Sequence, residues 1–417
     1  MSIAIQLRHA VTVTAGATPA SGTPEYWDGE IPWVTPEDVG RSREGYWLHD
    51  TRRKLTEDGY ANCGATLVPD PSIVLTKRAP IGQLAVLSME ACCNQGCFLL
   101  SPRAEHDARF VYYLLSTQAD VLQALGRGST FMELATDDLK ALKLTFPPLP
   151  RQRAIAAYLD RETAKIDAMI AAKERLLALL AEKRRALITH AVTRGLNPDA
   201  PMKDSGVEWL GEIPEHWDRC HLRRVLSSST YGISASAGPE GEIPMLRMGD
   251  IVDGEIDYSK LAFVDSVDPE VQLQVGDLLF NRTNSLDQIG KVGLVRSSDH
   301  FPCTFASYLV RLRVNDRALP EFLHLLLNST YSLSWARGEA IPSIGQANLN
   351  PFRYGYLQIP VPSTDEQRRI VGYCDTETTR IDSITRSTQA TLSLLNERRS
   401  ALIAAAVTGQ IDVEDAA

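Results

Sequence analysis

The feature that most limits how this chain can fold is an internal duplication at an offset of 215 residues. Residues 152–195 and residues 367–410 share 20 identities over 44 positions aligned without a gap. The Gln-Arg pair that starts at Gln152 has its counterpart at Gln367, and the Tyr-x-Asp-x-Glu-Thr string at 158–163 has its counterpart at 373–378. The chain therefore contains two copies of one unit of about half its length.

Both copies of the repeat predict a long helix. Residues 151–192 contain neither Gly nor Pro, and residues 365–408 contain a single Gly. Prolines precede the first copy, and Ser363-x-x-Glu366 has the pattern of a capping box before the second. Gly195 and Gly409 are typical helix ends. A helix of roughly 42 residues is ~63 Å long, which few globular domains can bury alone.

Apolar residues recur along both copies with near-heptad spacing. Such stripes are too long and too narrow to bury themselves, so we expect the two helices to pack antiparallel as a coiled coil. The alternative, in which each helix belongs to the core of its own domain, fits their length less well. The predicted packing residues are Leu159, Ile166, Leu177, Leu180 and Leu187 in the first copy, and Ile381, Leu392, Leu395 and Leu402 in the second.

The segments before the helices repeat more faintly. The strand-like residues 73–78 match residues 277–282, and both segments lead into a Gly-containing turn and then a short apolar helix. Their short strands and turns predict α+β units of about 150 residues. We expect two globular domains in a pseudo-two-fold arrangement, separated by the two long antiparallel helices. The predicted boundaries are 1–147 for the first domain, 148–197 for the central helix, 198–360 for the second domain, 361–409 for the distal helix and 410–417 for the tail.

Charge and cysteine content exclude several classes of protein. The net charge of −9 predicts weak non-specific DNA binding, although 33 of the 43 cationic residues are arginines that could form focused patches. Seven cysteines at irregular spacing form no disulfide framework, and Cys92, Cys93 and Cys97 lack the second pair that a zinc site needs, so we predict buried thiols and no metal. The absence of a signal peptide or a long apolar run predicts a cytoplasmic protein.

The sequence contains none of the common catalytic motifs that we sought. There is no Walker-type phosphate loop and no H-E-x-x-H zinc motif. The string nearest to an amino-methyltransferase motif, Phe146-Pro-Pro-Leu149, lacks both the leading carboxamide and the aromatic residue, and it is better interpreted as the start of a helix. These observations favour a protein without an active site of its own.

The duplicated helix start, at Pro147 to Ile155 and Pro360 to Ile370, resembles that of the specificity subunits of type I restriction-modification systems. So does the string 204–217, DSGVEWLGEIPEHW, which looks like the family's lead-in to a recognition domain. The resemblance covers nearly the whole chain. The first domain departs from the pattern, because residues 1–147 begin without such a lead-in.

The resemblance implies a function for both the domains and the helices. Each domain would read one half of a bipartite, asymmetric DNA target, and the helices would set the unread gap between the halves. The subunit would recruit two methyltransferase subunits and then the motor-nuclease subunits. It would bind no cofactor itself, whereas S-adenosylmethionine, ATP and Mg would bind to the partner subunits.

Candidate DNA-contacting residues lie at the turns after the matched strands and in the loops before the last strand of each domain. Arg and Asn pair with guanine and adenine edges, and Ser, Thr and Gln can bind phosphate. A solvated loop with a chance arginine is the alternative for each. The candidates are Lys77, Arg78, Arg127, Ser129 and Thr130 in the first domain, and Asn281, Arg282, Asn284, Arg337 and Gln346 in the second.

Three functions from other classes remain open at this point. A coiled-coil adaptor would join partners without any DNA sequence preference. A metal-dependent nuclease using the three clustered cysteines or loop carboxylates would cleave DNA without partners. A stand-alone DNA-binding regulator would bind its site tightly as a single chain, which the net charge of −9 disfavours.

Overall fold

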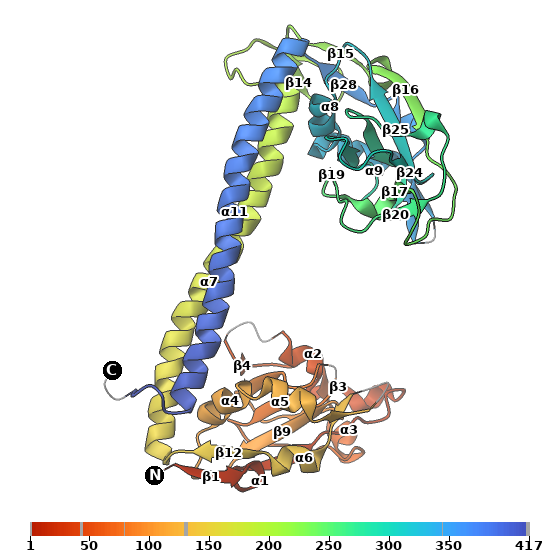
Figure 1. Cartoon of the computed structure of the whole chain (residues 1–417). Helices are drawn as coiled ribbons and strands as arrows, with labels where there is room; N and C mark the ends of the chain where they lie inside the picture. Colours follow the sequence, from red (N-terminus) through yellow and green to blue (C-terminus); the bar gives the residue numbers. More distant parts are fainter. Residues whose placement is uncertain (1, 42–44, 79, 129–131, 344, 414–417) are drawn as a thin grey trace. The chain divides into compact units, whose positions relative to one another are not determined.

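The computed structural model describes residues 2–41, 45–78, 80–128, 132–343 and 345–413. The chain divides into two compact units, each with its own hydrophobic core. Unit 1 comprises Met1–Arg175 and Thr388–Ala417, and unit 2 comprises Leu176–Ser387 (Figure 1). Each unit therefore combines one globular domain with a part of each long helix.

The main sheet of unit 1 has five strands in the order β2-β9-β6-β7-β4. Their bounds are Val11–Ala15 for β2, Cys97–Pro102 for β9, Ile73–Thr76 for β6, Leu84–Leu87 for β7 and Trp47–Leu48 for β4. All four residues of β6 are buried because β6 is central and both of its faces are covered. Ile73 and Leu75 share a core with helix α4 (Ala108–Ser116), whereas Val74 belongs to the core on the other face. This alternation is the two-residue period of a strand.

The main sheet of unit 2 repeats this order with four strands, β16-β25-β21-β23. Their bounds are Leu226–Tyr231 for β16, Leu309–Val314 for β25, Leu278–Asn281 for β21 and Val292–Leu294 for β23. Helix α8 (Pro320–Leu327) contributes Phe322 and Leu326 to the same core as Leu278 and Phe280. The predicted α+β class and the two domains are confirmed.

A second, smaller sheet also occurs in both units. Its middle strand pairs antiparallel with one neighbour and parallel with the other in each case. The strands are β3 (Trp27–Val34), β5 (Lys54–Leu55) and β8 (Cys92–Cys93) in unit 1, and β17 (Ile243–Leu246), β20 (Ala262–Val264) and β24 (Thr304–Phe305) in unit 2. The duplication thus extends through both domains, although their sequences have diverged.

Short elements complete each unit. Unit 1 also contains α1 (Leu7–Ala10), η1 (Pro24–Tyr26), α2 (Pro36–Val39), α3 (Glu57–Ala61), α5 (Ala119–Ala124) and α6 (Thr136–Ala141). Unit 2 also contains β13 (Met202–Asp204), β14 (Glu212–Pro214), η2 (Leu222–Arg224), η3 (Met248–Asp250), β18 (Ile251–Val252), β19 (Glu255–Ile256), η4 (Pro269–Val271), α9 (Thr330–Glu339) and α10 (Pro351–Tyr354).

The two long helices that the repeat predicts are present as α7 (Leu149–Arg194) and α11 (Thr364–Val407). Gly195 and Gly409 follow them with φ values of 77° and 76°, the left-handed conformation that ends a helix at low cost with glycine. Neither helix, nor any other helix in the described ranges, combines the length and apolar character that a membrane span requires.

The helices run antiparallel within each unit. In unit 1, Arg399 of α11 donates to both carboxylate oxygens of Asp167 of α7, at 2.7 and 3.3 Å. In unit 2, Arg184 of α7 lies 3.5 Å from Asp382 of α11. Of the residues predicted to pack, Leu159, Ile166, Leu180 and Ile381 are buried, whereas Leu177, Leu187, Leu392, Leu395 and Leu402 are half-buried.

A buried glutamine fixes the start of each long helix. In unit 1, Gln152 accepts from the backbone N–H of Asp107 at 3.0 Å and donates to the carbonyl of Pro147 at 2.8 Å. In unit 2, Gln367 makes the equivalent bonds to Leu319 N–H at 2.8 Å and Pro362 carbonyl at 2.9 Å. The duplicated Gln-Arg pair therefore contains a structural residue that joins each helix to its own domain.

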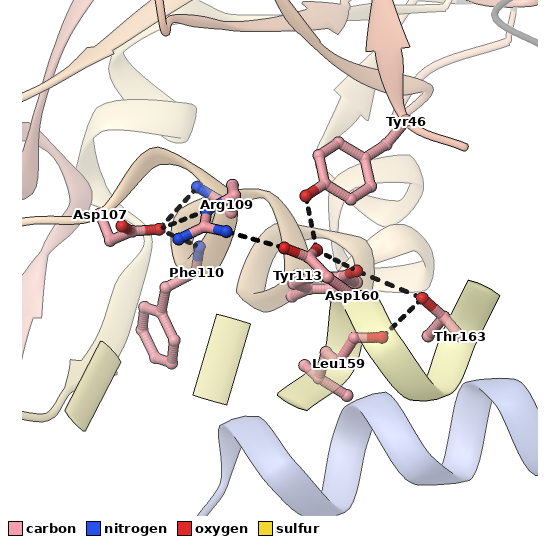
Figure 2. A network of polar contacts seen from close by, with 8 residues as sticks. All are labelled: Tyr46, Asp107, Arg109, Phe110, Tyr113, Leu159, Asp160 and Thr163. Carbon is pink, nitrogen blue, oxygen red and sulfur yellow. Dashed lines mark hydrogen bonds and ion pairs between the residues drawn. The ribbon is translucent and has the colours of Figure 1, made fainter. Parts of the chain in front are cut away.

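A second polar cluster attaches α7 to the first domain (Figure 2). Asp160 accepts hydrogen bonds from Tyr46 at 2.5 Å, Tyr113 at 2.9 Å and Arg109 at 2.8 Å. Burial raises the pKa of Tyr46 and of Tyr113 well above the usual range, and the bonds to Asp160 add to the increase. Both phenols therefore stay protonated and donate to the carboxylate at any physiological pH.

Candidate DNA interface

In unit 1 the structure brings together the two segments that the sequence selected separately. Strand β10 (Gly126–Arg127) pairs antiparallel with β11 (Glu133–Leu134), which forms a hairpin. The second strand of that hairpin also bridges to Arg78, directly after β6, and Leu134 N–H donates to the carbonyl of Lys77 at 2.9 Å. The turn after the central strand and the hairpin thus form one surface, which we call the unit 1 hairpin site (Lys77, Arg78, Arg127, Glu133).

Carboxylates hold the three cations of the unit 1 hairpin site. Lys77 and Arg78 contact the two oxygens of Glu133 at 2.8 and 2.9 Å, and Arg127 contacts Asp138 at 2.7 Å. The hydrogen bond from Lys77, with that from Arg78, keeps the pKa of Glu133 below its usual value. The side chain of Lys77 is 13% exposed, Arg78 46% and Arg127 74%. Arg127 is therefore the cation most available to a ligand.

Unit 2 contains the same construction. Strand β22 (Thr283–Asn284) follows the central strand β21 and pairs with β27 (Gln346–Asn348), which forms a hairpin with β26 (Ile341–Ser343). As in unit 1, the second strand of the hairpin lies beside the segment that follows the central strand. We call this surface the unit 2 hairpin site (Arg282, Asn284, Gln346, Asn348).

Arg282 is held in a fixed position in the unit 2 hairpin site. Its guanidinium donates to Oδ1 of Asn348 at 3.1 Å and lies 5.2 Å from the ring centroid of Tyr231. An arginine stacked on an aromatic ring loses less side-chain freedom when it binds a base edge or a phosphate. Asn348 and Tyr231 were not among the candidates, since neither lies in a sequence pattern associated with DNA contact.

The remaining candidates divide by accessibility. Asn281 is fully buried at the end of β21, where its side chain donates to the carbonyl of Met248 at 3.3 Å, so we leave it out of the proposed interface. Asn284 is half-buried and Gln346 is exposed. Arg337, at the end of α9, is exposed and donates to the Asp287 carbonyl at 3.2 Å. Ser129 and Thr130 lie outside the described residues.

The structure also reveals a cavity, lined by two arginines and a glutamate, that the repeat did not predict. It has a volume of about 550 Å³ and lies beside the small sheet of unit 1, lined by Trp33, Arg52, Arg53 and Asn94 among others. The guanidinium of Arg53 lies 3.5 Å from the ring centroid of Trp27. In the sequence, the run Arg52-Arg53-Lys54 could have indicated this cavity. The run has no counterpart in the second domain, so a comparison of the two repeats does not select it.

The clustered cysteines are buried thiols in unit 1. Burial raises the pKa of Cys92 and of Cys97 to about 12, so both are protonated thiols at neutral pH. Within the described ranges, no group of three or more His, Cys, Asp or Glu side chains could hold a metal ion.

Comparisons with known proteins find similarity to the specificity subunits of type I restriction enzymes. The family model of the type I restriction modification DNA specificity domain matches residues 6–178. The EcoBI specificity subunit of Escherichia coli is 24% identical over 405 residues, covering 94% of this chain and 78% of the relative. The MjaIX specificity subunit of Methanocaldococcus jannaschii is 34% identical over 150 residues, a match that spans about a third (34%) of that relative.

Solved structures share the fold over almost the full length. A chain from a type I restriction-modification complex has a TM-score of 0.75 at 15% identity and covers 97% of both chains. The HsdS subunit of Thermoanaerobacter tengcongensis has a TM-score of 0.53 at 15% identity, covering 98% of this chain and 97% of the other. This chain shares its duplicated fold with both of these solved chains. Over most of its length the chain is similar to the specificity subunits of type I restriction enzymes.

Proposed function

We propose that this chain is the subunit that selects the DNA target of a type I restriction-modification complex, with one half-site read by each domain. The hairpin sites of units 1 and 2 would each contact one half of a bipartite target. Because the two sites differ in sequence and in side-chain chemistry, the two half-sites would differ and the target would be asymmetric. The helices α7 and α11 would set the length of the unread gap.

The observation that carries this proposal is the repeated placement of a hairpin against the end of a central strand. Arginine is available at both sites, as Arg127 in unit 1 and Arg282 in unit 2. Arginine can form bidentate bonds to guanine in the major groove or bind phosphate. A scaffold that keeps its strand order while changing the side chains at one edge is suited to reading different sequences with the same geometry.

The catalytic steps belong to partner subunits in this proposal. Two methyltransferase subunits with S-adenosylmethionine, and motor-nuclease subunits with ATP and Mg, would assemble on this chain in the cytoplasm. The helices would provide the docking surface for the methyltransferases. This chain would position those enzymes on the DNA and would not touch the reacting atoms.

The experiment that tests the proposal is a genome-wide methylation map of cells with and without the gene. We expect one gapped adenine-methylation motif that disappears on deletion. Replacing residues 1–147 with those of a related subunit should change one half of the motif and leave the other half and the gap unchanged. Unchanged methylation in the deletion strain, with the partner methyltransferase active, would reject the proposal and favour a coiled-coil adaptor.

A further inference from the structure

One arginine beside the small sheet of unit 1 is both accessible and free of acidic partners. Arg53 precedes β5 and lines the cavity of about 550 Å³ together with Glu37 and Asn94. Arg53 is exposed, and no residue in the described ranges forms a hydrogen bond or an ion pair with its guanidinium. Each of the three cations of the unit 1 hairpin site, by contrast, contacts a carboxylate. The guanidinium of Arg53 is therefore better placed than these cations to bond a ligand.

Two buried tryptophans hold Arg53 in position. Its guanidinium lies over the ring of Trp27, 3.5 Å from the centroid, and 5.9 Å from the ring centroid of Trp33. The two rings meet edge to face at 5.1 Å, and the indole N–H of Trp33 donates to the carbonyl of Ala17 at 3.0 Å. The carbonyl of Arg53 accepts from the hydroxyl of Thr51 at 2.8 Å. A guanidinium fixed in this way loses little side-chain freedom on binding, so it suits a planar ligand with two adjacent acceptors.

The loop of residues 94–96 joins this cavity to the unit 1 hairpin site. Asn94 lines the cavity, and its side chain accepts from the backbone N–H of Gly96 at 2.9 Å. The carbonyl of Gly96 in turn accepts from the backbone N–H of Lys77, a residue of the hairpin site, at 2.9 Å. A Cβ added to Gly96 would come within 3.1 Å of the ring of Pro36, which also lines the cavity. The cavity and the hairpin site are therefore neighbours, and one DNA duplex can contact both.

The cavity wall carries both signs of charge, which favours a base pair over a phosphate as the ligand. Glu37 shares the wall with Arg53, and its side chain is 68% exposed although it forms an ion pair with Arg52. An exposed carboxylate repels a phosphate. In the major groove, a G·C pair presents the acceptors N7 and O6 of guanine beside the N4 amine of cytosine, which donates. A fixed arginine next to a carboxylate matches that edge.

Unit 2 has an alanine at the equivalent place. The string Ile-Pro occurs in the middle strand of both small sheets, and its proline pairs with Lys54 in unit 1 and with Phe263 in unit 2. The residue before Lys54 is Arg53, whereas the residue before Phe263 is Ala262, which is buried. A contact made by Arg53 would therefore be confined to the half-site that unit 1 reads.

We propose that Arg53 is a specificity-determining residue, which reads the guanine of one G·C pair in the half-site of unit 1 from the major groove. Trp27 is a positioning residue, because it acts through the guanidinium that it holds. The inference rests on the proposed function, since it names one base pair of the target that unit 1 would read. The proposed function does not require Arg53, so the two can fail separately.

The first test maps methylation in cells whose complex carries the native chain, Arg53→Ala or Arg53→Gln. Glutamine keeps much of the side-chain volume above Trp27, which guards against a loss of folding. We expect the preference for guanine at one position in one half of the motif to fall by roughly tenfold or more in both variants. The other half and the gap should not change. Arg103→Ala, which alters an exposed arginine after the last residue of β9, should leave the whole motif intact.

The second test uses the native complex and does not depend on the folding of a variant. Each guanine of the unit 1 half-site is replaced in turn by 7-deazaguanine, which lacks the N7 acceptor. At one position this change should weaken binding by the native complex roughly tenfold. The Arg53→Ala complex should bind that duplex and the unmodified duplex equally.

Three results would overturn the inference and leave the proposed function standing. They are a motif that neither variant changes, a weakening of methylation that is uniform over all sites, as a phosphate contact would give, and native binding that tolerates every 7-deazaguanine. The absence of any gapped motif in cells with the native gene would instead reject the proposed function, and this inference with it.

Discussion

Single residues in the hairpin sites differ in how freely their charge can reach a ligand. Glu133 contacts both Lys77 and Arg78, so these two cations are positioned by the protein itself. Arg127 has the most exposed side chain of the three and shares only one carboxylate, Asp138. Under the proposed function, Arg127 should make the most direct contact with the phosphate backbone in unit 1.

Replacing Arg127 by Ala should weaken DNA binding by the assembled complex roughly fivefold at low salt, and should reduce the salt slope of log K by about 1, since one phosphate contact is lost. Titrations at several salt concentrations measure both quantities. Arg103→Ala is the matched control, because Arg103 follows the last residue of β9, whereas the first residue of β9 pairs with the end of β6 beside the hairpin site. A salt slope identical to that of the native complex would remove Arg127 from the interface.

Asn281 shows why site residues are harder to predict than elements. The sequence aligns residues 277–282 with residues 73–78, which suggested that both Asn281 and Arg282 lie in a turn. The strand β21 extends through Asn281, and a central strand buries its last residue as fully as its first. Strands β6 and β21 both have four residues, and Asn281 occupies the place of Thr76, the buried last residue of β6. A displacement of one residue in the sequence match therefore separates a buried amide from an accessible side chain. The contact of Arg282 with Tyr231 joins segments about fifty residues apart, and local sequence patterns carry no information on such pairs.

At the scale of elements, the long helices were the most predictable part of the fold. Their period, their bounding residues and their duplication all appear in the sequence, and α7 and α11 begin within a few residues of the predicted positions. The pairing of β11 with the end of β6, and of β27 with β22, was not predictable. Strand pairing depends on contacts between distant segments, whereas helix periodicity is local.

The glutamines at the helix starts give a prediction for stability. Gln152→Ala removes a buried amide, so the Asp107 N–H and the Pro147 carbonyl lose their hydrogen bonds to it. The free energy of unfolding should therefore fall by about 3 kcal/mol. Gln367→Ala should have a similar effect in unit 2. Chemical denaturation measures both, with the exposed Gln389→Ala as a control that should change stability by less than about 0.5 kcal/mol. Equal effects at all three positions would contradict an anchoring role.

Helix α8 gives a prediction for pH dependence through His324. Burial lowers the pKa of His324 below 6.5, and the ring contacts the carbonyl of Gly254 at 2.7 Å. As pH falls, His324 is protonated in the unfolded chain before it is protonated in the folded chain. The stability that neutral His324 contributes is therefore complete above pH 6.5, and it is lost as pH falls towards the pKa of His324 in the folded state.

Melting temperatures at about pH 7.5 and about pH 5.5 test this. His324→Gln should lose less stability on acidification than the native chain, because it removes one titrating group. His106, whose pKa burial also lowers, remains in both proteins and cancels in the comparison. An identical acid-induced decrease in both proteins would show that His324 does not titrate on unfolding.

At the scale of the whole molecule, two separate cores predict two unfolding transitions. Phe98 belongs to the core of unit 1 and Phe280 to that of unit 2, and both are fully buried. Phe98→Ala should destabilise one transition in calorimetry by about 4 kcal/mol, and Phe280→Ala should destabilise the other. If both variants shift a single common transition, the units unfold together and the division into two energetic units is wrong.

The composition of unit 1 has a consequence for the order in which the protein matures on the ribosome. The first domain is synthesised first, yet its core includes Ile403, Ala406, Val407 and Val413 near the other end of the chain. Unit 2 needs nothing beyond Ser387, so it can finish folding while the apolar groove of unit 1 still awaits its last helix. The first domain should therefore stay incompletely packed until these residues are synthesised, and a product that stops after Ser387 would leave unit 1 open and unit 2 intact.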